Sequence, residues 1–309
     1  MTGRVLRSIN NIYSVQSDNG EIFQCRIKGK RLEQADGEYN PIVVGDIVDF
    51  DKVSDEDGLV VFRHDRKSLF ARWNTKNQGN QVICANMDMV VCVCSVETPP
   101  FRPRFVDRVI ACCRNVPVVI CLNKNDILLT EDEYERFELY GKLGFKTISV
   151  SALTGDGTDE LKKMLKGKTT AFIGQSGVGK SSLVNMLSGS SQRVGDVSEK
   201  YNRGRHTTNH ALLIECGDYN IIDTPGFREI SVPHDDARLI RDSFPEFVKA
   251  SGKCAYDTCM HVNEPDCEVI RLVEKGKINS DRYESYVRML ESLNDRLPLW
   301  SRNVQKNGK

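Results

Sequence analysis

The stretch that decides the fold is Gly174-Gln175-Ser176-Gly177-Val178-Gly179-Lys180-Ser181. It matches the phosphate-loop pattern G-x-x-x-x-G-K-[ST]. A strand-like run, residues 169–173, comes before it and a helix-like run, residues 182–187, follows it, which is the context that the motif requires. The alternative, a glycine turn between a strand and a helix, has no need of Lys-Ser at this spacing. The stretch therefore predicts a central α/β domain that binds the phosphates of a nucleotide.

The residue types in this loop suit phosphate chemistry. Glycines let the backbone curl so that successive N–H groups point at phosphate oxygens, and the N-terminus of the following helix adds a partial positive charge. Lys180 can reach the β- and γ-phosphates, and the Ser181 hydroxyl can bind Mg²⁺. The loop is unusually late in the chain, because more than half of the residues precede it.

A second motif indicates which base the nucleotide carries. A predicted buried strand, residues 116–122, ends in Asn123-Lys124-Asn125-Asp126, which matches the guanine-reading pattern N-K-x-D. The Asp126 carboxylate can accept from the N1–H and the 2-amino group of guanine, whereas adenine would leave a buried Asp126 unpaired. Lys124 can lie across the base, and Asn123 can tie this loop to the phosphate loop. A polar turn at a strand end is the alternative for the four residues taken alone.

A third, weaker motif follows the next predicted strand, residues 146–150. Ser151-Ala152-Leu153 resembles the S-A-x triplet whose backbone contacts guanine O6. Its distance after N-K-x-D gives it weight. A further buried strand is expected at residues 87–96, and helices are expected at residues 104–115, 131–143 and 159–166.

Two loops after the phosphate loop are expected to sense the γ-phosphate. Residues 188–206 lack periodicity and read as a long loop that ends in Gly204-Arg205-His206-Thr207-Thr208. Thr207 and Thr208 are both candidates for the residue that reaches Mg²⁺ and the γ-phosphate, and spacing does not decide between them. After predicted strands at residues 210–216 and 219–222 comes a second switch, Asp223-Thr224-Pro225-Gly226. Asp223 is placed to hold Mg²⁺ through water, and the Gly226 N–H to bond the γ-phosphate.

The residue after Gly226 bears on catalysis. Many GTPases have a Gln there that orients the attacking water, but this chain has Phe227, whose ring can neither donate nor accept the required hydrogen bond. We therefore expect slow intrinsic hydrolysis, or another group that positions the water. His206 is one candidate, although it could equally be a solvated loop residue, and a group supplied by a partner is another. The candidate catalytic residues are Lys180, His206 and Thr208.

The motifs occur in a permuted order. The base-reading loop and Ser151-Ala152-Leu153 precede the phosphate loop, whereas GTP switches usually begin with the phosphate loop. The sheet can still be complete, because the helix at residues 159–166 can link the usual last strand to the usual first. The second switch then runs directly into the C-terminal segment.

The first seventy residues predict a small β-barrel. The expected strands are five short runs: 4–9, 12–16, 21–28, 42–50 and 58–64. Five strands in about sixty residues favour an OB-fold, a barrel that often binds oligonucleotides. A basic cluster of Arg26, Lys28, Lys30 and Arg31 fits such a role, but an ordinary solvated face is the alternative. Residues 65–81 read as a linker with some positive charge.

The C-terminal segment contains the ligands for a metal. Cys254, Cys259, His261 and Cys267 lie within fourteen residues, and three Cys with one His make a closed tetrahedral set for structural Zn²⁺. Glu264 is nearby but is disfavoured as a ligand once four softer ones are present. Helices are expected at residues 268–275 and 281–296, the second with a possible Asp281/Glu284 capping box. Their positive bias suits docking to RNA or protein: Arg271, Lys275, Lys277, Arg282 and Arg288.

Whole-chain numbers exclude several classes of protein. The 309 residues predict two or three domains, and 43 basic with 43 acidic residues give no net charge that would favour nucleic acid or an anionic membrane. The N-terminus lacks a signal-peptide pattern, and no run approaches the ~20 apolar residues of a membrane span. The eleven cysteines lie partly in apolar strand-like runs, as reduced thiols do. We expect a cytoplasmic protein that contacts no membrane and is a monomer.

Together these motifs resemble the bacterial ribosome small subunit-dependent GTPase A family, a circularly permuted GTPase family, over essentially the whole chain. The resemblance implies a multidomain protein with an N-terminal OB-fold barrel (1–68), a central permuted α/β P-loop GTPase domain (69–232) and a small helical zinc domain (233–309). The zinc ligands would be the three cysteines and His261, with Mg²⁺ on Ser181 and on Thr207 or Thr208. The motifs and the resemblance give these GTP-binding residues: Asn123, Lys124, Asp126, Ser151, Ala152, Gly174, Gln175, Ser176, Gly177, Val178, Gly179, Lys180, Ser181, Ser182, Asp223 and Gly226.

The resemblance also implies what the protein does. Members bind the small ribosomal subunit and its rRNA during late maturation, and the subunit stimulates hydrolysis of GTP to GDP. Two departures matter here: Asn209 replaces a third Thr after His206, and Gly177 stands where some GTPases have an Asn that recruits K⁺. A nucleotide-gated RNA-binding protein in which hydrolysis is incidental is the alternative function. An ATPase is disfavoured by Asp126.

Overall fold

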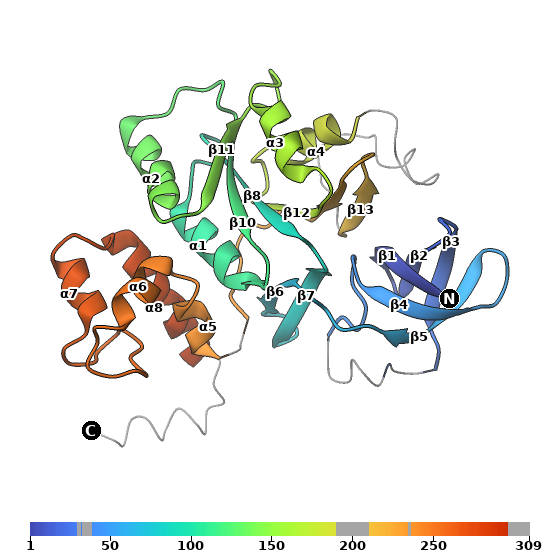
Figure 1. Ribbon diagram of the computed structural model, residues 1–309, viewed down its shortest axis with the longest axis horizontal. Coiled ribbons are helices and arrows are strands. Elements are labelled where there is room, and N and C mark those ends of the chain that lie inside the picture. The colour runs from blue at the N-terminus through green and yellow to red at the C-terminus, as the bar shows by residue number, and fades with distance from the viewer. Residues whose placement is uncertain (30–31, 33–38, 190–209, 234–235, 296–309) are drawn as a thin grey trace.

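The computed structural model describes residues 1–29, 32, 39–189, 210–233 and 236–295. Three bodies follow one another in space as in the chain (Figure 1): a β-barrel, a central sheet with helices on both faces, and a helical C-terminal unit. None of the helices in the described ranges combines the length and the apolar character that crossing a bilayer requires.

The barrel is the OB-fold that the sequence predicts. It has five strands: β1 (Thr2–Ile9), β2 (Ile12–Ser17), β3 (Ile22–Ile27), β4 (Ile47–Lys52) and β5 (Asp57–Arg63). They pair in the order β1-β2-β3-β5-β4 and close on β1, with only the β3–β5 pair parallel. Alternate residues such as Tyr13, Val15 and Phe23 point inward and are buried, so the interior is a packed core.

The prediction of a linker at residues 65–81 is wrong. Two antiparallel strands, β6 (Leu69–Asn74) and β7 (Gly79–Ala85), form a hairpin there, and the short strand β9 (Cys113–Arg114) pairs with β6. The Asn74 side chain accepts the Lys76 N–H at 3.0 Å and so shapes the turn. Phe70 and Ala71 in β6 and Cys84 and Ala85 in β7 are buried, whereas the other residues of the two strands are at least partly exposed and several are polar, so the sequence shows no clear alternation. The pairing of β9 also ends the preceding helix at Cys112, earlier than predicted.

The central sheet has the predicted strands in the predicted arrangement. Five strands are parallel, β11 (Lys146–Val150), β10 (Val118–Asn123), β8 (Met89–Ser95), β12 (Thr169–Gly174) and β14 (Asn220–Asp223), and β13 (Leu212–Glu215) is antiparallel to β14. Helices α1 (Pro103–Cys112) and α2 (Glu131–Lys142) cover one face, and α3 (Thr158–Leu165) and α4 (Lys180–Ser188) the other. Burial on both faces explains why these strands are continuous apolar runs.

Permutation leaves the sheet intact. α3 connects β11, at one edge, to β12, near the middle, so the strand that carries the phosphate loop still lies between β8 and β14. The carboxyl ends of the five parallel strands therefore meet at one edge, where loops from distant parts of the sequence lie together.

Within residues 236–295 the C-terminal unit has four helices: α5 (Ala237–Arg241), α6 (Pro245–Ser251), α7 (Glu268–Glu274) and α8 (Ser280–Asn294). The predicted capping box at Asp281 is wrong, because the helix starts earlier: Asn279 is the N-cap, and its side chain accepts the Arg282 N–H at 3.0 Å. Glu284 instead binds Arg104 of α1 at 2.6 Å and Arg288.

A buried charge network docks this unit on the central domain. Arg282 of α8, 1% exposed, donates to Asp107 of α1 and, at 2.6 Å, to Glu246 of α6. Its guanidinium also lies over the rings of Tyr140 and Phe244, at 5.2 and 4.6 Å. Arg282 is therefore an interdomain anchor and not part of an exposed basic surface, which corrects the reading from sequence.

We expect Arg282→Met to lower the free energy of unfolding by about 3–5 kcal/mol, because two carboxylates would stay buried without their cation. Urea unfolding followed by circular dichroism measures the loss. Arg104→Met, which breaks only the partly exposed pair with Glu284, is the matched control and should change stability little. Equal effects of the two substitutions would contradict the anchoring role.

Candidate nucleotide-binding site and metal centre

The phosphate loop lies between β12 and α4, with its backbone curled around the helix N-terminus. Gly179 is the N-cap of α4 and has a φ of 83°, in the left-handed region. A Cβ at this position would lie 2.3 Å from the Asn123 side-chain nitrogen. Only glycine allows both the conformation and this close approach. Ser181 and Ser182 are exposed in the first turn of α4, where their hydroxyls can be reached by a ligand.

Asn123 joins three of the predicted motifs. Its side-chain nitrogen donates to the Val178 carbonyl of the phosphate loop at 2.9 Å, and its side-chain oxygen accepts the Ala152 N–H at 3.0 Å. The side chain is 1% exposed, so these hydrogen bonds are shielded from water. The structure thus brings the N-K-x-D loop, the S-A-L triplet and the phosphate loop together, as the sequence predicts.

Asp126 is oriented by Ser151. The Ser151 hydroxyl donates to the Asp126 carboxylate at 2.5 Å and accepts the N–H groups of Leu153 and Thr154, each at 3.1 Å. Asp126 itself is exposed. The expectation of a buried carboxylate is therefore corrected: the cost of leaving it unpaired arises only when a base covers it. Lys124 is anchored nearby, because its ammonium donates to the Glu97 and Thr98 carbonyls at 2.8 and 3.0 Å.

The second switch is held against the phosphate loop. Lys180 and Asp223 form a buried ion pair. The Phe227 N–H donates to the Gly174 carbonyl at 3.0 Å, and the Ser176 N–H donates to the Phe227 carbonyl at 3.1 Å. Gly226 passes so close that a Cβ there would lie 3.1 Å from the Ser176 Cα. Thr224 completes the contact through its hydroxyl, which donates to the Phe172 carbonyl at 2.7 Å.

The Phe227 side chain is buried, 5% exposed, and packs against Phe70 and Arg72 of the β6–β7 hairpin. Sequence patterns do not predict this contact, because they indicate a linker where the hairpin lies. The candidate residues His206, Thr207 and Thr208 lie outside the described residues.

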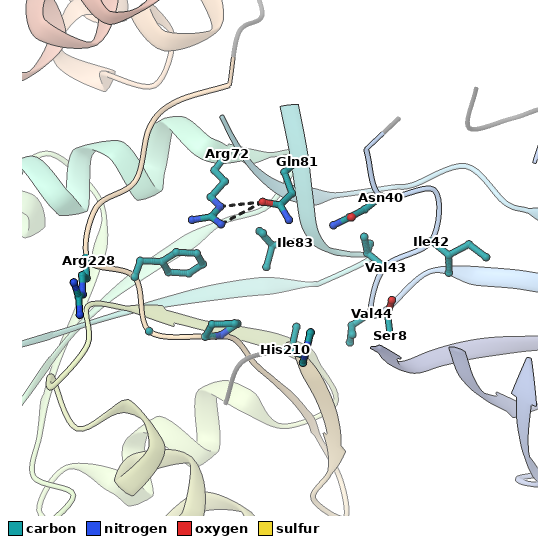
Figure 2. A pocket seen from close by; sticks show the side chains of 14 residues that line it. Ser8, Asn40, Ile42, Val43, Val44, Arg72, Gln81, Ile83, His210 and Arg228 are labelled. Carbon is teal, nitrogen blue, oxygen red and sulfur yellow. Dashed lines mark hydrogen bonds between the residues drawn. The ribbon is translucent and has the colours of Figure 1, made fainter. Parts of the chain in front are cut away.

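A pocket of about 280 Å³ opens beside the second switch (Figure 2). Its walls come from the barrel loop at Asn40 to Val44, from the hairpin at Arg72 and Gln81, and from Pro225 to Arg228. His210 lies at its floor in the view of Figure 2. The barrel, the hairpin and the second switch therefore meet around one cavity.

The four predicted metal ligands converge. Their ligand atoms all lie within 4.8 Å of one another, and His261 Nδ1 is 3.4 Å from Cys267 Sγ and 3.7 Å from Cys254 Sγ. Tetrahedral zinc with Zn–S near 2.3 Å and Zn–N near 2.0 Å would separate its ligands by about 3.5–3.8 Å. The cluster is therefore compatible with a zinc site.

Without a metal, burial favours the neutral forms of both the thiols and the imidazole of this cluster. Burial raises the pKa of the Cys259 thiol to about 12 and also raises that of Cys267, while burial lowers the pKa of His261. A bound divalent ion would reverse the penalty on the thiolates. Glu264 does not belong to the cluster: its carboxylate accepts the N–H groups of Met260 and Val262, at 2.7 and 2.8 Å, and so braces the ligand loop.

We expect the purified wild-type protein to contain about one zinc ion per chain, and Cys259→Ser to lose it, because a closed site needs all four ligands. Elemental mass spectrometry measures the metal content. Cys216→Ser, at a partly exposed thiol after β13, should retain zinc. A wild-type chain that neither carries zinc nor takes it up in a titration would rule out the metal site.

The sequence comparisons agree with this geometry. The RsgA GTPase family profile matches residues 63–233, and the RsgA N-terminal domain profile matches residues 2–60. The "Small ribosomal subunit biogenesis GTPase RsgA" of Borreliella burgdorferi (strain ZS7) is 38% identical over 293 residues, covering 94% of this chain and 95% of that protein. The protein of the same name from Flavobacterium psychrophilum is 36% identical over 304 residues, covering 94% and 93%.

Solved structures give the same picture. YjeQ from Thermotoga maritima matches with a TM-score of 0.69 and 29% identity, covering 94% of this chain and 98% of that one. YloQ, described as a circularly permuted GTPase, matches with a TM-score of 0.68 and 25% identity, covering 96% of each chain. The chain belongs to the RsgA GTPase family: it is a GTP hydrolase built on a circularly permuted GTPase domain.

Proposed function

We propose that this protein hydrolyses GTP while bound to the small ribosomal subunit during its late maturation, and that the subunit stimulates the reaction. The observation that carries the proposal is the match, over 94% of the chain, to proteins named for small-subunit biogenesis. The complete set of guanine and phosphate motifs at one sheet edge supports it. We further propose that it acts as a cytoplasmic monomer, with domains at residues 1–68, 69–232 and 233–309.

In this proposal the base is recognised by residues that the structure already orients. Asp126, held by Ser151, accepts from guanine N1–H and the 2-amino group. The Lys124 stem lies along the base, because its ammonium is fixed by two carbonyls. The backbone of Ser151 and Ala152 contacts guanine O6, and Asn123 keeps this loop against the phosphate loop.

The phosphates are bound by the loop at Gly174 to Ser182, including the N–H groups of Gln175 through Val178. Lys180 exchanges Asp223 for the β- and γ-phosphates, a stronger anionic partner. This exchange frees Asp223 to hold Mg²⁺ through water, while Ser181 binds the ion directly. Thr207 or Thr208 completes the Mg²⁺ site, and the Gly226 N–H bonds the γ-phosphate. Mg²⁺ supplies charge neutralisation on the transferred phosphoryl group.

The candidates for the catalytic group are Lys180, His206 and Thr208, and a group supplied by a partner is the alternative. Phe227 is excluded from orienting water by its chemistry, and its ring is packed in the hairpin contact. Slow hydrolysis in the absence of a partner follows from this, because no side chain at position 227 holds the attacking water.

RNA contacts are proposed for the two outer domains. Arg26 is exposed on β3, whereas Lys28 pairs with Asp51 at 2.9 Å; Lys30 and Arg31 lie outside the described residues. In the C-terminal unit Lys275 and Lys277 are exposed beyond α7. One structural Zn²⁺ on the Cys254, Cys259, His261 and Cys267 set would hold the helices that present them.

A nucleotide-gated RNA-binding protein is the second candidate. Phe227 favours it, because a chain that lacks the water-orienting Gln could use GTP mainly as a binding signal. The two functions differ in how they respond to the loss of hydrolysis. If GTP acts only as a binding signal, release from the RNA continues without hydrolysis; if the protein works through an enzyme cycle, release stops.

We expect purified small subunits to raise the GTP turnover of this protein by at least about tenfold, a lowering of the barrier by roughly 1.4 kcal/mol. Phosphate release with and without subunits is the measurement, and large subunits are the control. Lys180→Ala should abolish turnover in both conditions and block release from the subunit. If the wild-type protein is released normally when it carries a non-hydrolysable GTP analogue, the binding-only function is correct; this arm is needed because Lys180→Ala also removes a phosphate contact.

We expect Asp126→Asn to weaken GTP binding by about 100-fold, because an amide nitrogen would face the guanine 2-amino donor where an acceptor is needed. Fluorescent-nucleotide titration measures the dissociation constant. Asp132→Asn, on the exposed side of α2, is the charge-matched control and should bind GTP normally. Undiminished affinity of the Asp126 variant would show that the base is read elsewhere.

A further inference from the structure

The Phe227 ring contacts the β6–β7 hairpin through both a cation and an aromatic ring. The Arg72 guanidinium lies 5.4 Å from the centre of the Phe227 ring, and Phe70 meets the same ring at 5.9 Å. Figure 2 shows Arg72 beside Gln81, to which its guanidinium is hydrogen-bonded, among the residues that line the pocket. The ring is thus held between an aromatic edge and a charge.

Arg72 is set in place by neutral groups. Its guanidinium donates to the Gln81 side-chain oxygen at 3.2 and 3.3 Å, and Asn74 donates to the same oxygen at 3.1 Å. Among the described residues no carboxylate pairs with Arg72. Burial also disfavours the charged guanidinium and lowers its pKa. A half-buried guanidinium without an acidic partner gains from an aromatic face, which attracts a cation most when water is excluded. The Phe227 ring is therefore its charge-stabilising partner.

Holding the Phe227 ring in place also fixes the backbone of Gly226 and Phe227, next to the phosphate loop. The two main-chain hydrogen bonds of Phe227 go to Gly174 and Ser176 of the phosphate loop. Gly226, the proposed γ-phosphate contact, is the preceding residue and touches Ser176. A ring that moved would carry the Gly226 N–H with it, since the two residues share a peptide bond.

The hairpin is also bonded to the barrel and to the segment that follows the second switch. On the barrel side the Ala85 N–H donates to the Val44 carbonyl at 3.0 Å, and the Asn40 side chain donates to the Val82 carbonyl at 3.1 Å. On the other side the Trp73 N–H donates to the Ser231 carbonyl at 2.8 Å, in the segment that leads to the C-terminal helices. The hairpin thus contacts the barrel, the second switch and the segment that leads to the C-terminal unit.

We propose that Arg72 is a positioning residue for GTP hydrolysis. By holding the Phe227 ring it fixes the position of the second switch, and because its hairpin is bonded to the barrel, a movement of the barrel is transmitted to the nucleotide site. Arg72 touches neither the base-reading nor the phosphate-binding side chains. Its loss should therefore lower kcat without weakening the binding of GDP, which has no γ-phosphate to contact Gly226.

The test is a double-mutant cycle on intrinsic, subunit-free hydrolysis. Arg72→Met keeps the length of the side chain and removes the charge; Phe227→Leu keeps most of the apolar volume and removes the ring. We expect each to lower kcat by about 3- to 10-fold, with KM and the GDP dissociation constant within about twofold of wild type. The double variant should be no slower than the slower single variant, because both remove the same contact.

Conservative variants and a control complete the design. Arg72→Lys keeps a cation over the ring and should recover part of the lost rate. Gln81→Met releases Arg72 without touching the ring and gives a second route to the same loss if Phe227→Leu does not fold. Lys76→Gln removes a charge from the exposed hairpin turn and should turn over GTP normally.

Wild-type kcat in Arg72→Met, or rate losses that multiply in the double variant, would overturn the proposal. A parallel rise in KM or in the GDP dissociation constant would also overturn it, since it would mark a general structural defect. The inference rests on the GTPase activity and on the proposed role of Gly226. Because no subunits are present, its failure is distinguishable from a failure of the subunit-stimulated function.

Discussion

The hydrogen bonds of Asn123 are the constraint on which the nucleotide site depends. One buried amide joins the base-reading loop to the phosphate loop and to the triplet that follows β11. These segments are far apart in sequence, and permutation has changed which comes first, yet the amide needs only that β10, β11 and β12 end at the same edge of the sheet. A parallel sheet satisfies that condition whatever the order of its connections. The site therefore survives permutation because it depends on the sheet edge and not on the chain order.

Because of the permutation, the second switch is directly connected to the C-terminal unit, and packing restricts how far the connecting segment can move. The second switch continues directly into residues 228–233, where Ile230 and Val232 are each 1% exposed and Ser231 is bonded to the hairpin. This is no long, free tether. Arg282 meanwhile anchors the C-terminal unit to α1, away from the switch. Within the described residues, the second switch is thus followed by a segment that is bonded to the hairpin and is buried at Ile230 and Val232.

Sequence patterns predicted the site because its chemistry is local: a phosphate loop, a guanine loop and a Cys₃His set each show in fewer than fifteen residues. The barrel and the parallel strands were predictable for the same reason, since alternation and continuous apolar runs follow directly from which faces are buried. The β6–β7 hairpin was not, because Arg72, Asn74 and Gln81 look like a polar linker until the domains around them are assembled. The N-cap of α8 is Asn279, two residues before the predicted Asp281, and Glu284, the predicted partner in the capping box, contacts Arg104 instead.

The substitution of Phe for Gln at position 227 separates two tasks that one residue performs in many GTPases. A Gln after the D-x-x-G turn both belongs to the switch and orients the water. Here the side chain is committed to packing, so the switch is tied to the hairpin and, through Val44, to the barrel. The water must then be oriented by a group outside that turn. On the proposed role of Arg72, such a division of tasks makes the enzyme slow alone and couples the second switch to the barrel through the Phe227 contact.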